Sequence, residues 1–127
     1  MVSALRRLFS RDPYSHVVQE IKKLSELDGG WNGYRAGRIL PEAQQQAISF
    51  VGRFSDLPVR IPAPSVAPTP NGGVALHWLS ADHEVELIFL AAGGEYLVAQ
   101  RGREDVVDAG AMDHVDPLKD IVQAYVR

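Results

Sequence analysis

Hydrophobic side chains recur at intervals of three and four residues in three parts of the chain, a spacing typical of amphipathic helices. Each part follows a proline, at Pro13, Pro41 and Pro117, and proline at the first helical position loses no helical hydrogen bond. The three apolar stripes are Tyr14, Val17, Val18, Ile21, Leu24 and Leu27; Ala43, Ala47, Ile48, Phe50, Val51 and Phe54; and Leu118, Ile121, Val122, Tyr125 and Val126. We predict three helices, with Asp116 capping the third and Gln44, Gln45 and Gln46 on the solvent side of the second.

The pattern changes to alternation between the second and third predicted helices, which is typical of strands with one buried face. The alternating segments are GGVALHWL, HEVELIFLA and EYLVAQ, followed by the shorter EDVVDA. The separators SAD, AAGG and RGR are too short for a crossover, so neighbouring strands are predicted to be antiparallel. Glu84 and Glu86 mark a solvent face, and the helices are expected to cover the opposite face. The fold class is therefore α+β, with a three- or four-stranded meander and the order α-α-β-β-β-(β)-α.

A proline-rich stretch separates the first two predicted helices from the predicted sheet. Five of the eight prolines lie between residues 57 and 72, and this stretch is predicted to be an extended connector on the surface. A chain of 127 residues fits one domain, with residues 1–12 as a short amphipathic lead-in. There is no cysteine and no apolar run near the roughly 20 residues of a membrane span. We expect a cytoplasmic protein with no membrane partner and no disulfide or thiolate chemistry.

Charge is divided unevenly along the chain. Residues 1–60 carry nine Lys or Arg and six Asp or Glu, whereas residues 61–127 carry four and ten, which gives the net charge of −3. Binding to duplex nucleic acid requires a concentrated basic surface, and the basic residues of the first half are scattered. Nucleic-acid binding, by the basic N-terminal segment, is therefore disfavoured.

The segment LDGGWNGYRAGRIL, residues 27–40, links the first two predicted helices and allows two interpretations. In the structural one, Gly29 or Gly30 forms a left-handed helix cap and the aromatic rings anchor the link. In the functional one, the segment grips a planar anion such as a nucleotide or a carboxylate, with the side chains of Trp31, Tyr34, Arg35 and Arg38. No strand precedes the glycines and no phosphate-loop spacing is present, so the structural interpretation is favoured.

Two phrases resemble a recurring group of small bacterial proteins. These are GGWNGYRAGRILPEA and PSVAPTPNGGVALHW, and the match covers about residues 24–90. In that group a Gly-Trp-(Asn/Asp)-Gly-Tyr elbow precedes a helix, and a proline-rich run leads to a strand that ends in tryptophan. The resemblance implies a shared fold with no assigned activity and, often, a mobile-element or accessory role. It implies no catalytic residue.

The remaining chemistry-bearing residues lack the spacing of an active site. His77 and His83 flank a predicted hairpin turn, but no established metal-ligand spacing accompanies them. Ser65, Thr69 and Ser80 lie outside any nucleophile-elbow motif. We predict no metal, no cofactor and no catalytic residue.

Three functional hypotheses follow. The favoured one is a small, non-enzymatic cytoplasmic accessory protein that binds a protein partner or itself, with an immunity or inhibitor role as one form. Its candidate surfaces are Trp31, Tyr34 and Arg38 on one side and Glu84 and Glu86 on the other. The alternative is a small-anion-binding protein or enzyme that uses the loop from Trp31 to Arg38. The third, nucleic-acid binding by the N-terminal segment, is the least favoured.

Overall fold

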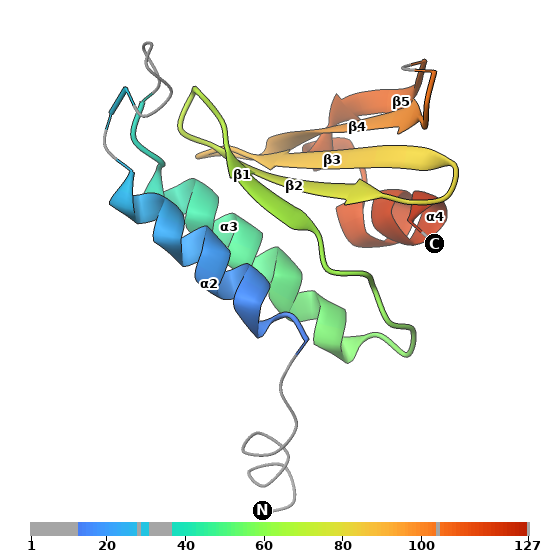
Figure 1. Ribbon diagram of the computed structural model, residues 1–127, viewed down its shortest axis with the longest axis horizontal. Helices are drawn as coiled ribbons and strands as arrows, with labels where there is room; N and C mark the ends of the chain where they lie inside the picture. Colours follow the sequence, from blue (N-terminus) through green and yellow to red (C-terminus); the bar gives the residue numbers. More distant parts are fainter. Residues whose placement is uncertain (1–12, 28, 31–36, 104, 127) are drawn as a thin grey trace, which may run out of the picture.

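The protein consists of an antiparallel sheet with helical elements packed on one face, as the ribbon in Figure 1 shows. The computed structural model describes residues 13–27, 29–30, 37–103 and 105–126. The sheet has five strands in the spatial order β1-β2-β3-β4-β5, which is the order of the sequence. The predicted α+β class and the antiparallel meander are confirmed, and the sheet has one strand more than the alternating pattern indicates.

The strands follow the predicted alternation closely. They are β1 (Ser65–Pro68), β2 (Val74–Leu79), β3 (His83–Phe89), β4 (Gly94–Gln100) and β5 (Val106–Ala111). The register of β2 and β3 places Trp78 opposite Val85 and Leu76 opposite Leu87, so the large apolar side chains share one face. A β-bulge interrupts the pairing of β4 with β5 at Val98.

The additional strand lies inside the proline-rich connector. Residues Ser65–Pro68 pair with β2, and prolines are tolerated there because β1 is an edge strand. A side chain of β2 also holds the connector, because the indole N–H of Trp78 donates a hydrogen bond to the carbonyl of Pro62 (2.7 Å). Ile61 is buried and exchanges two hydrogen bonds with the hydroxyl of Tyr14. The connector is therefore extended, as predicted, but it is part of the sheet and the core.

Two helical elements form the N-terminal layer. Helix α2 (Ser15–Lys23) continues into the 3-10 turn η1 (Leu24–Glu26), and α3 (Pro41–Gly52) continues into η2 (Arg53–Asp56). Helix α3 begins at the predicted proline and packs on β2 and β3, where the rings of Phe50 and Phe89 lie 5.3 Å apart. The predicted first helix is present, with Val17 and Ile21 fully buried, but it begins at Ser15 and Pro13 lies in the turn before it, not at its first position. Asp12, the residue before Pro13, lies outside the described residues.

The glutamine run of α3 holds the layers together, which corrects the expectation of a purely solvent-facing run. The side-chain amide of Gln44 donates to the carbonyl of Ile21 (2.9 Å) at the end of α2. The amide of Gln46 donates to the carbonyls of Leu90 and Ala91 (2.9 Å each), in the turn after β3. Only the middle residue, Gln45, is exposed. Glutamine side chains here tie α3 to the last turn of α2 and to the turn after β3.

The C-terminal element is a π-helical turn, not the regular helix of about three turns that the pattern indicates. The chain passes through η3 (Met112–His114), η4 (Pro117–Val122) and the short α4 (Gln123–Tyr125). Asp116 caps this element as predicted, because its carboxylate accepts hydrogen bonds from the amides of Leu118 (3.1 Å) and Lys119 (3.4 Å). The element packs on β3 and β4.

The hydrophobic core lies between these helical elements and one face of the sheet. The largest side chains that are completely buried are Phe54, Ile21, Leu76, Leu87 and Ile121. They come from the N-terminal and C-terminal helical elements and from strands β2 and β3. Among the described residues, no helix has the length and apolar character of a membrane span. The opposite face of the sheet is not covered by any helix of the described chain.

Candidate functional site: the open face of the sheet

The open face of the sheet presents a mixture of acidic and apolar side chains. Side chains alternate between the two faces along a strand, so the sequence neighbours of the buried residues point away from the core. On β3 and β4 the register sets Glu86 opposite Leu97 and Ile88 opposite Glu95. Acidic and apolar side chains therefore alternate in a two-by-two arrangement, with the two carboxylates on one diagonal.

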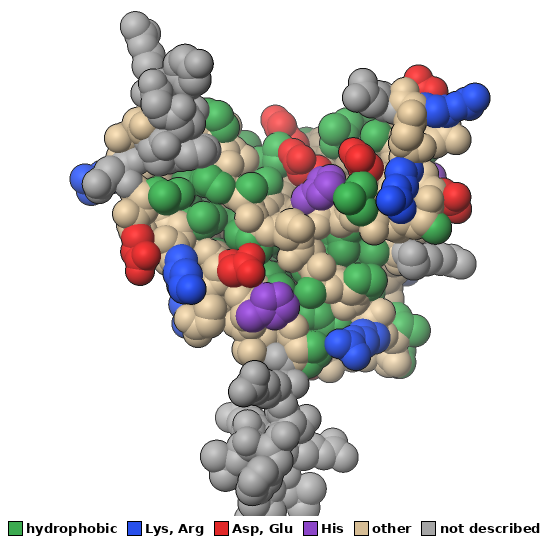
Figure 2. Space-filling model, viewed as in Figure 1, with side chains coloured by type: hydrophobic (Ala, Val, Ile, Leu, Met, Phe, Trp, Pro, Cys, Tyr) green, Lys and Arg blue, Asp and Glu red, His purple; other side chains and the backbone are tan. Residues whose placement is uncertain are grey.

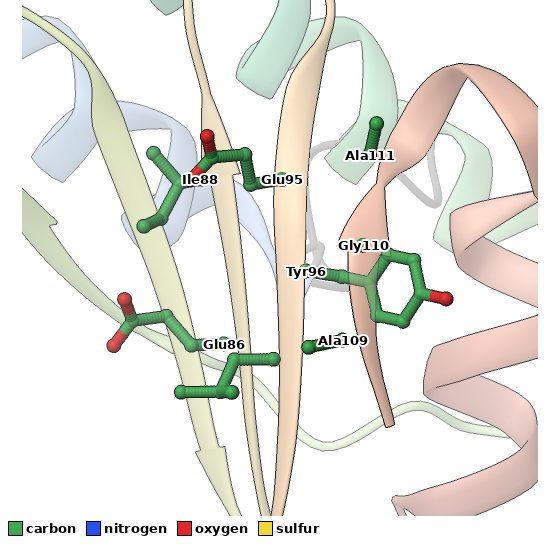
Figure 3. Close-up of a pocket in the computed structure, with 8 residues that line it drawn as sticks. Glu86, Ile88, Glu95, Tyr96, Ala109, Gly110 and Ala111 are labelled. Carbon is green, nitrogen blue, oxygen red and sulfur yellow. The ribbon is translucent and has the colours of Figure 1, made fainter. Parts of the chain in front are cut away.

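A groove of about 390 Å³ runs over this arrangement toward the outer strand β5. It is lined by Glu86, Ile88, Glu95, Tyr96, Leu97, Ala109, Gly110 and Ala111. Figure 3 shows Glu86, Ile88 and Glu95 on the same side of the sheet, whereas the ring of Tyr96 points to the side of the C-terminal helical element. The hollow exists because β5 contributes only alanine and glycine there, next to larger side chains on β3 and β4.

The charge of this face is negative. Glu84, Glu86 and Glu95 lie on its strands, and none of them forms an ion pair with another described residue. His77 lies opposite Glu86 in the register of β2 and β3. Figure 2 shows acidic side chains around a histidine on the surface over the strands, away from helices α2 and α3. Carboxylates beside exposed apolar side chains attract cationic groups and leave the apolar surface available for contact.

Several large apolar side chains of the strands are exposed on this face. Leu97 is 40% exposed, Leu79 at the end of β2 is 57% exposed and Val106 at the start of β5 is 62% exposed. By contrast, Val98, the neighbour of Leu97 along β4, is completely buried on the core side. The two faces of β4 therefore differ in function: one builds the core and the other is accessible.

Tyr96 supports the groove from the covered side. Its hydroxyl donates a hydrogen bond to a carboxylate oxygen of Asp108 on β5 (3.1 Å). Burial raises the pKa of Tyr96, and the hydrogen bond and negative charge of Asp108 raise this pKa further. The phenol therefore stays protonated at neutral pH and links β4 to β5 beneath the groove.

Comparison of the chain with family models, curated proteins and solved structures found no match. The geometry of the molecule therefore carries the functional argument. The resemblance to small bacterial proteins with a glycine-rich elbow stays a prediction.

The structure describes only part of the two predicted surfaces. Trp31, Tyr34 and Arg35 lie outside the described residues. Arg38 is exposed, in a segment that packs against the turn between β1 and β2. Glu84 and Glu86 lie on the open face, as predicted from their alternation with Val85 and Leu87.

The elbow segment and the β1–β2 turn are bound together by their backbones. The amide of Gly37 donates to the carbonyl of Pro70 (2.9 Å), and the amide of Leu40 donates to the carbonyl of Gly72 (2.8 Å). These residues belong to the two phrases that carry the resemblance, so the phrases are neighbours in the fold. Gly30 has a left-handed φ of 79°, but it follows the extended Leu27 and is a turn residue beyond the helix, not its cap.

Two of the three hydroxyl groups considered as nucleophiles, those of Ser80 and Thr69, have structural partners. The hydroxyl of Ser80 donates toward the carbonyls of His83 and Tyr125 (3.1 Å each), and it accepts from the amide of His83. The hydroxyl of Thr69 accepts from the amide of Gly73 (2.8 Å) inside the β1–β2 turn. Within the described residues no group of three His, Cys, Asp or Glu side chains is placed to hold a metal ion.

Apart from Glu86, the residues that form the groove were missed by the sequence interpretation. Glu95 and Leu97 lie in the segment EYLVAQ, where aromatic, apolar and polar side chains occur on both faces and the alternation does not identify the exposed one. Ala109, Gly110 and Ala111 give no chemical signal, because their contribution is the absence of bulk. The short, small-residue character of the last strand was the only available indication.

Proposed function

We propose that this protein is a small, non-enzymatic binding protein that acts through protein–protein contact, with the open face of the sheet as its binding surface. The observation that carries the proposal is the groove over β3, β4 and β5, where apolar side chains and carboxylates without ion-pair partners in the described chain lie side by side. A contact that covers exposed apolar area is favourable because that area leaves water, at about 25 cal/mol per Å².

The layout of the face fits a protein partner. Protein interfaces combine an apolar centre with a polar rim, and here Ile88 and Leu97 lie among the carboxylates of Glu84, Glu86 and Glu95. The groove is shallow and open along the sheet, whereas small-molecule sites enclose most of their ligand. A cytoplasmic accessory, immunity or inhibitor role is the narrower form of this proposal, and the resemblance supports only its accessory part.

The alternative, an anion-binding elbow, has weaker support. The backbone amides of Gly37 and Leu40, at the end of the elbow segment, already donate to carbonyls of the β1–β2 turn and so are not free to bind an anion. Of the four side chains proposed for that site, the structure describes only Arg38. No described contact favours an anion at this position over the structural role.

Site-specific photo-cross-linking in the producing cell tests the proposal. A photoreactive amino acid replaces Leu97 on the open face or, as a control, Gln45 on the exposed side of α3. We expect an adduct of defined mass at position 97 with one protein, identified by mass spectrometry, and none at position 45. Equal labelling at the two positions, or no adduct at position 97, would contradict the proposed function.

A further inference from the structure

The groove on the open face also indicates the chemistry of its partner. Resting on the proposed function, we infer that the partner presents an extended basic segment, in which two Lys or Arg side chains pair with Glu86 and Glu95 and an apolar side chain next to this pair on the same side enters the groove. This inference names the class of ligand, which the proposed function leaves open.

The spacing of the carboxylates fits an extended chain. Glu86 lies opposite Leu97 and Glu95 lies opposite Ile88, so the two carboxylates are diagonal neighbours on adjacent strands. Diagonal neighbours are separated by roughly 7–8 Å. Alternate side chains of an extended segment lie roughly 6.6 Å apart, since each residue advances the chain by about 3.3 Å. Basic residues at positions i and i+2 of an extended segment therefore match the diagonal, and an apolar residue at position i−2 or i+4 points to the same side, toward the groove.

The small residues of β5 provide the seat for the apolar side chain. Ala109 lies opposite Leu97 and Ala111 lies opposite Glu95, and neither fills the space beside its larger neighbour. The groove thus extends to the outer strand, whose far edge pairs with no other strand of the described chain. A segment entering from that side meets no obstruction from the rest of the described sheet.

Charge separates this partner from two other occupants. A second copy that docked its own open face by two-fold symmetry would bring Glu84, Glu86 and Glu95 against the same three carboxylates, and like charges oppose that contact. The phosphates of nucleic acid would meet the same repulsion. Basic side chains, by contrast, gain ion pairs with carboxylates that have none within the described residues.

Panning of the full-length chain against a displayed library of random peptides tests the inference. We expect the enriched peptides to carry two Lys or Arg residues at positions i and i+2, with an apolar residue two positions before or after this pair. In fluorescence anisotropy these peptides should bind about three- to tenfold more weakly to the double variant Glu86→Gln/Glu95→Gln. The matched control is Glu20→Gln/Glu42→Gln, which removes the same charge from exposed positions on α2 and α3 and should leave affinity unchanged. Affinity should also fall as salt is raised.

Several outcomes would overturn the inference. These are enrichment of neutral or acidic peptides, equal binding to the two double variants, and a dimer in sedimentation that Leu97→Arg abolishes, which would make a second copy the occupant. A cross-link at position 97 to a protein without an extended basic segment would support the proposed function and contradict only the inference about the chemistry of the partner. Failure of that cross-link would instead count against the proposed function.

Discussion

Tyr14 joins two segments that are 47 residues apart. Its hydroxyl donates to the carbonyl of Ile61 (2.6 Å) and accepts from the amide of the same residue (3.0 Å), and both residues are buried. Phenylalanine would leave the amide and the carbonyl without this partner, so Tyr14→Phe should lower the free energy of unfolding by about 1–3 kcal/mol. Urea unfolding measures the change.

Tyr125→Phe is the matched control for that substitution. Tyr125 is half-buried, its ring meets that of His83 edge-to-face with the centroids 5.1 Å apart, and its hydroxyl has no hydrogen bond to another described residue. We expect a loss of less than about 0.5 kcal/mol from this change. Equal losses from the two substitutions would show that the buried hydrogen bonds do not fix the connector. The sequence predicts Tyr14 as a core residue from its spacing, but not its partner, because the partner depends on where the proline-rich run crosses the helix.

Asp116 gives the fold a dependence on acid. Burial alone would raise the pKa of this carboxyl, but hydrogen bonds from the amides of Lys119 and Leu118 and the guanidinium of Arg53 outweigh it, so the pKa is lowered from 3.8. A carboxylate whose pKa is lower in the folded state stabilises the fold in full above the unfolded value. That contribution is lost as the pH falls through the folded value.

The expected result is a difference between two pH profiles. Asp116→Asn should show a smaller loss of stability than the wild type between about pH 5 and pH 2, since its cap does not titrate. At pH 7 the loss from Asp116→Ala should be about 0.5–2 kcal/mol, the range of a helix cap. Parallel profiles for wild type and Asp116→Asn would contradict the assignment. The role of this residue is predictable from sequence, because Asp followed by Pro marks a helix start locally.

At the scale of elements, the elbow segment and the β1–β2 turn depend on a close backbone approach. Gly72 has a left-handed φ of +86°, and a Cβ atom at this position would lie 2.8 Å from the carbonyl oxygen of Arg38. Gly102 has a similar φ of +82° with open space around it. Both glycines therefore have a left-handed φ, but an added Cβ atom would meet the backbone of Arg38 only at Gly72.

Alanine substitution at the two positions isolates that contact. Gly102→Ala should cost about 1–2 kcal/mol, the strain of a left-handed alanine. Gly72→Ala should cost more, because the elbow segment must also move away from the turn. Thermal unfolding monitored by circular dichroism provides both values. If the two variants lose the same stability, the contact between elbow and turn is not part of what holds them together.

The elements themselves were largely predictable, and the exceptions have physical causes. Helix α3 and strands β2 and β3 follow from local periodicity, because their buried faces are long and regular. Strand β1 was not predictable, since its proline content favours an extended coil and only its pairing with β2 makes it a strand. The π-helical turn at Pro117–Val122 likewise depends on packing against β3 and β4, which spacing alone does not report.

At the scale of the whole molecule, the layers leave the sheet with two different faces. One face is closed by helical elements from both ends of the chain, and the other carries the groove. The sequence predicts this asymmetry through Glu84 and Glu86, which alternate with buried residues. It does not predict the groove, because a hollow arises where small side chains on one strand lie beside large ones on the next. Which side chains are neighbours is known only once the pairing register of the strands is known.

The difference between the two faces predicts that Leu→Ala substitutions on adjacent strands lower stability by different amounts. Leu87 on β3 is fully buried against the helical elements, and Leu97 on β4 is 40% exposed on the open face. Leu87→Ala should lower the free energy of unfolding by about 2–5 kcal/mol, because the helices cannot fill the cavity. Leu97→Ala should cost about 1 kcal/mol or less, since water already contacts its side chain. Urea unfolding of both variants checks this, and comparable losses would mean that the open face is built for stability and not for contact with another molecule.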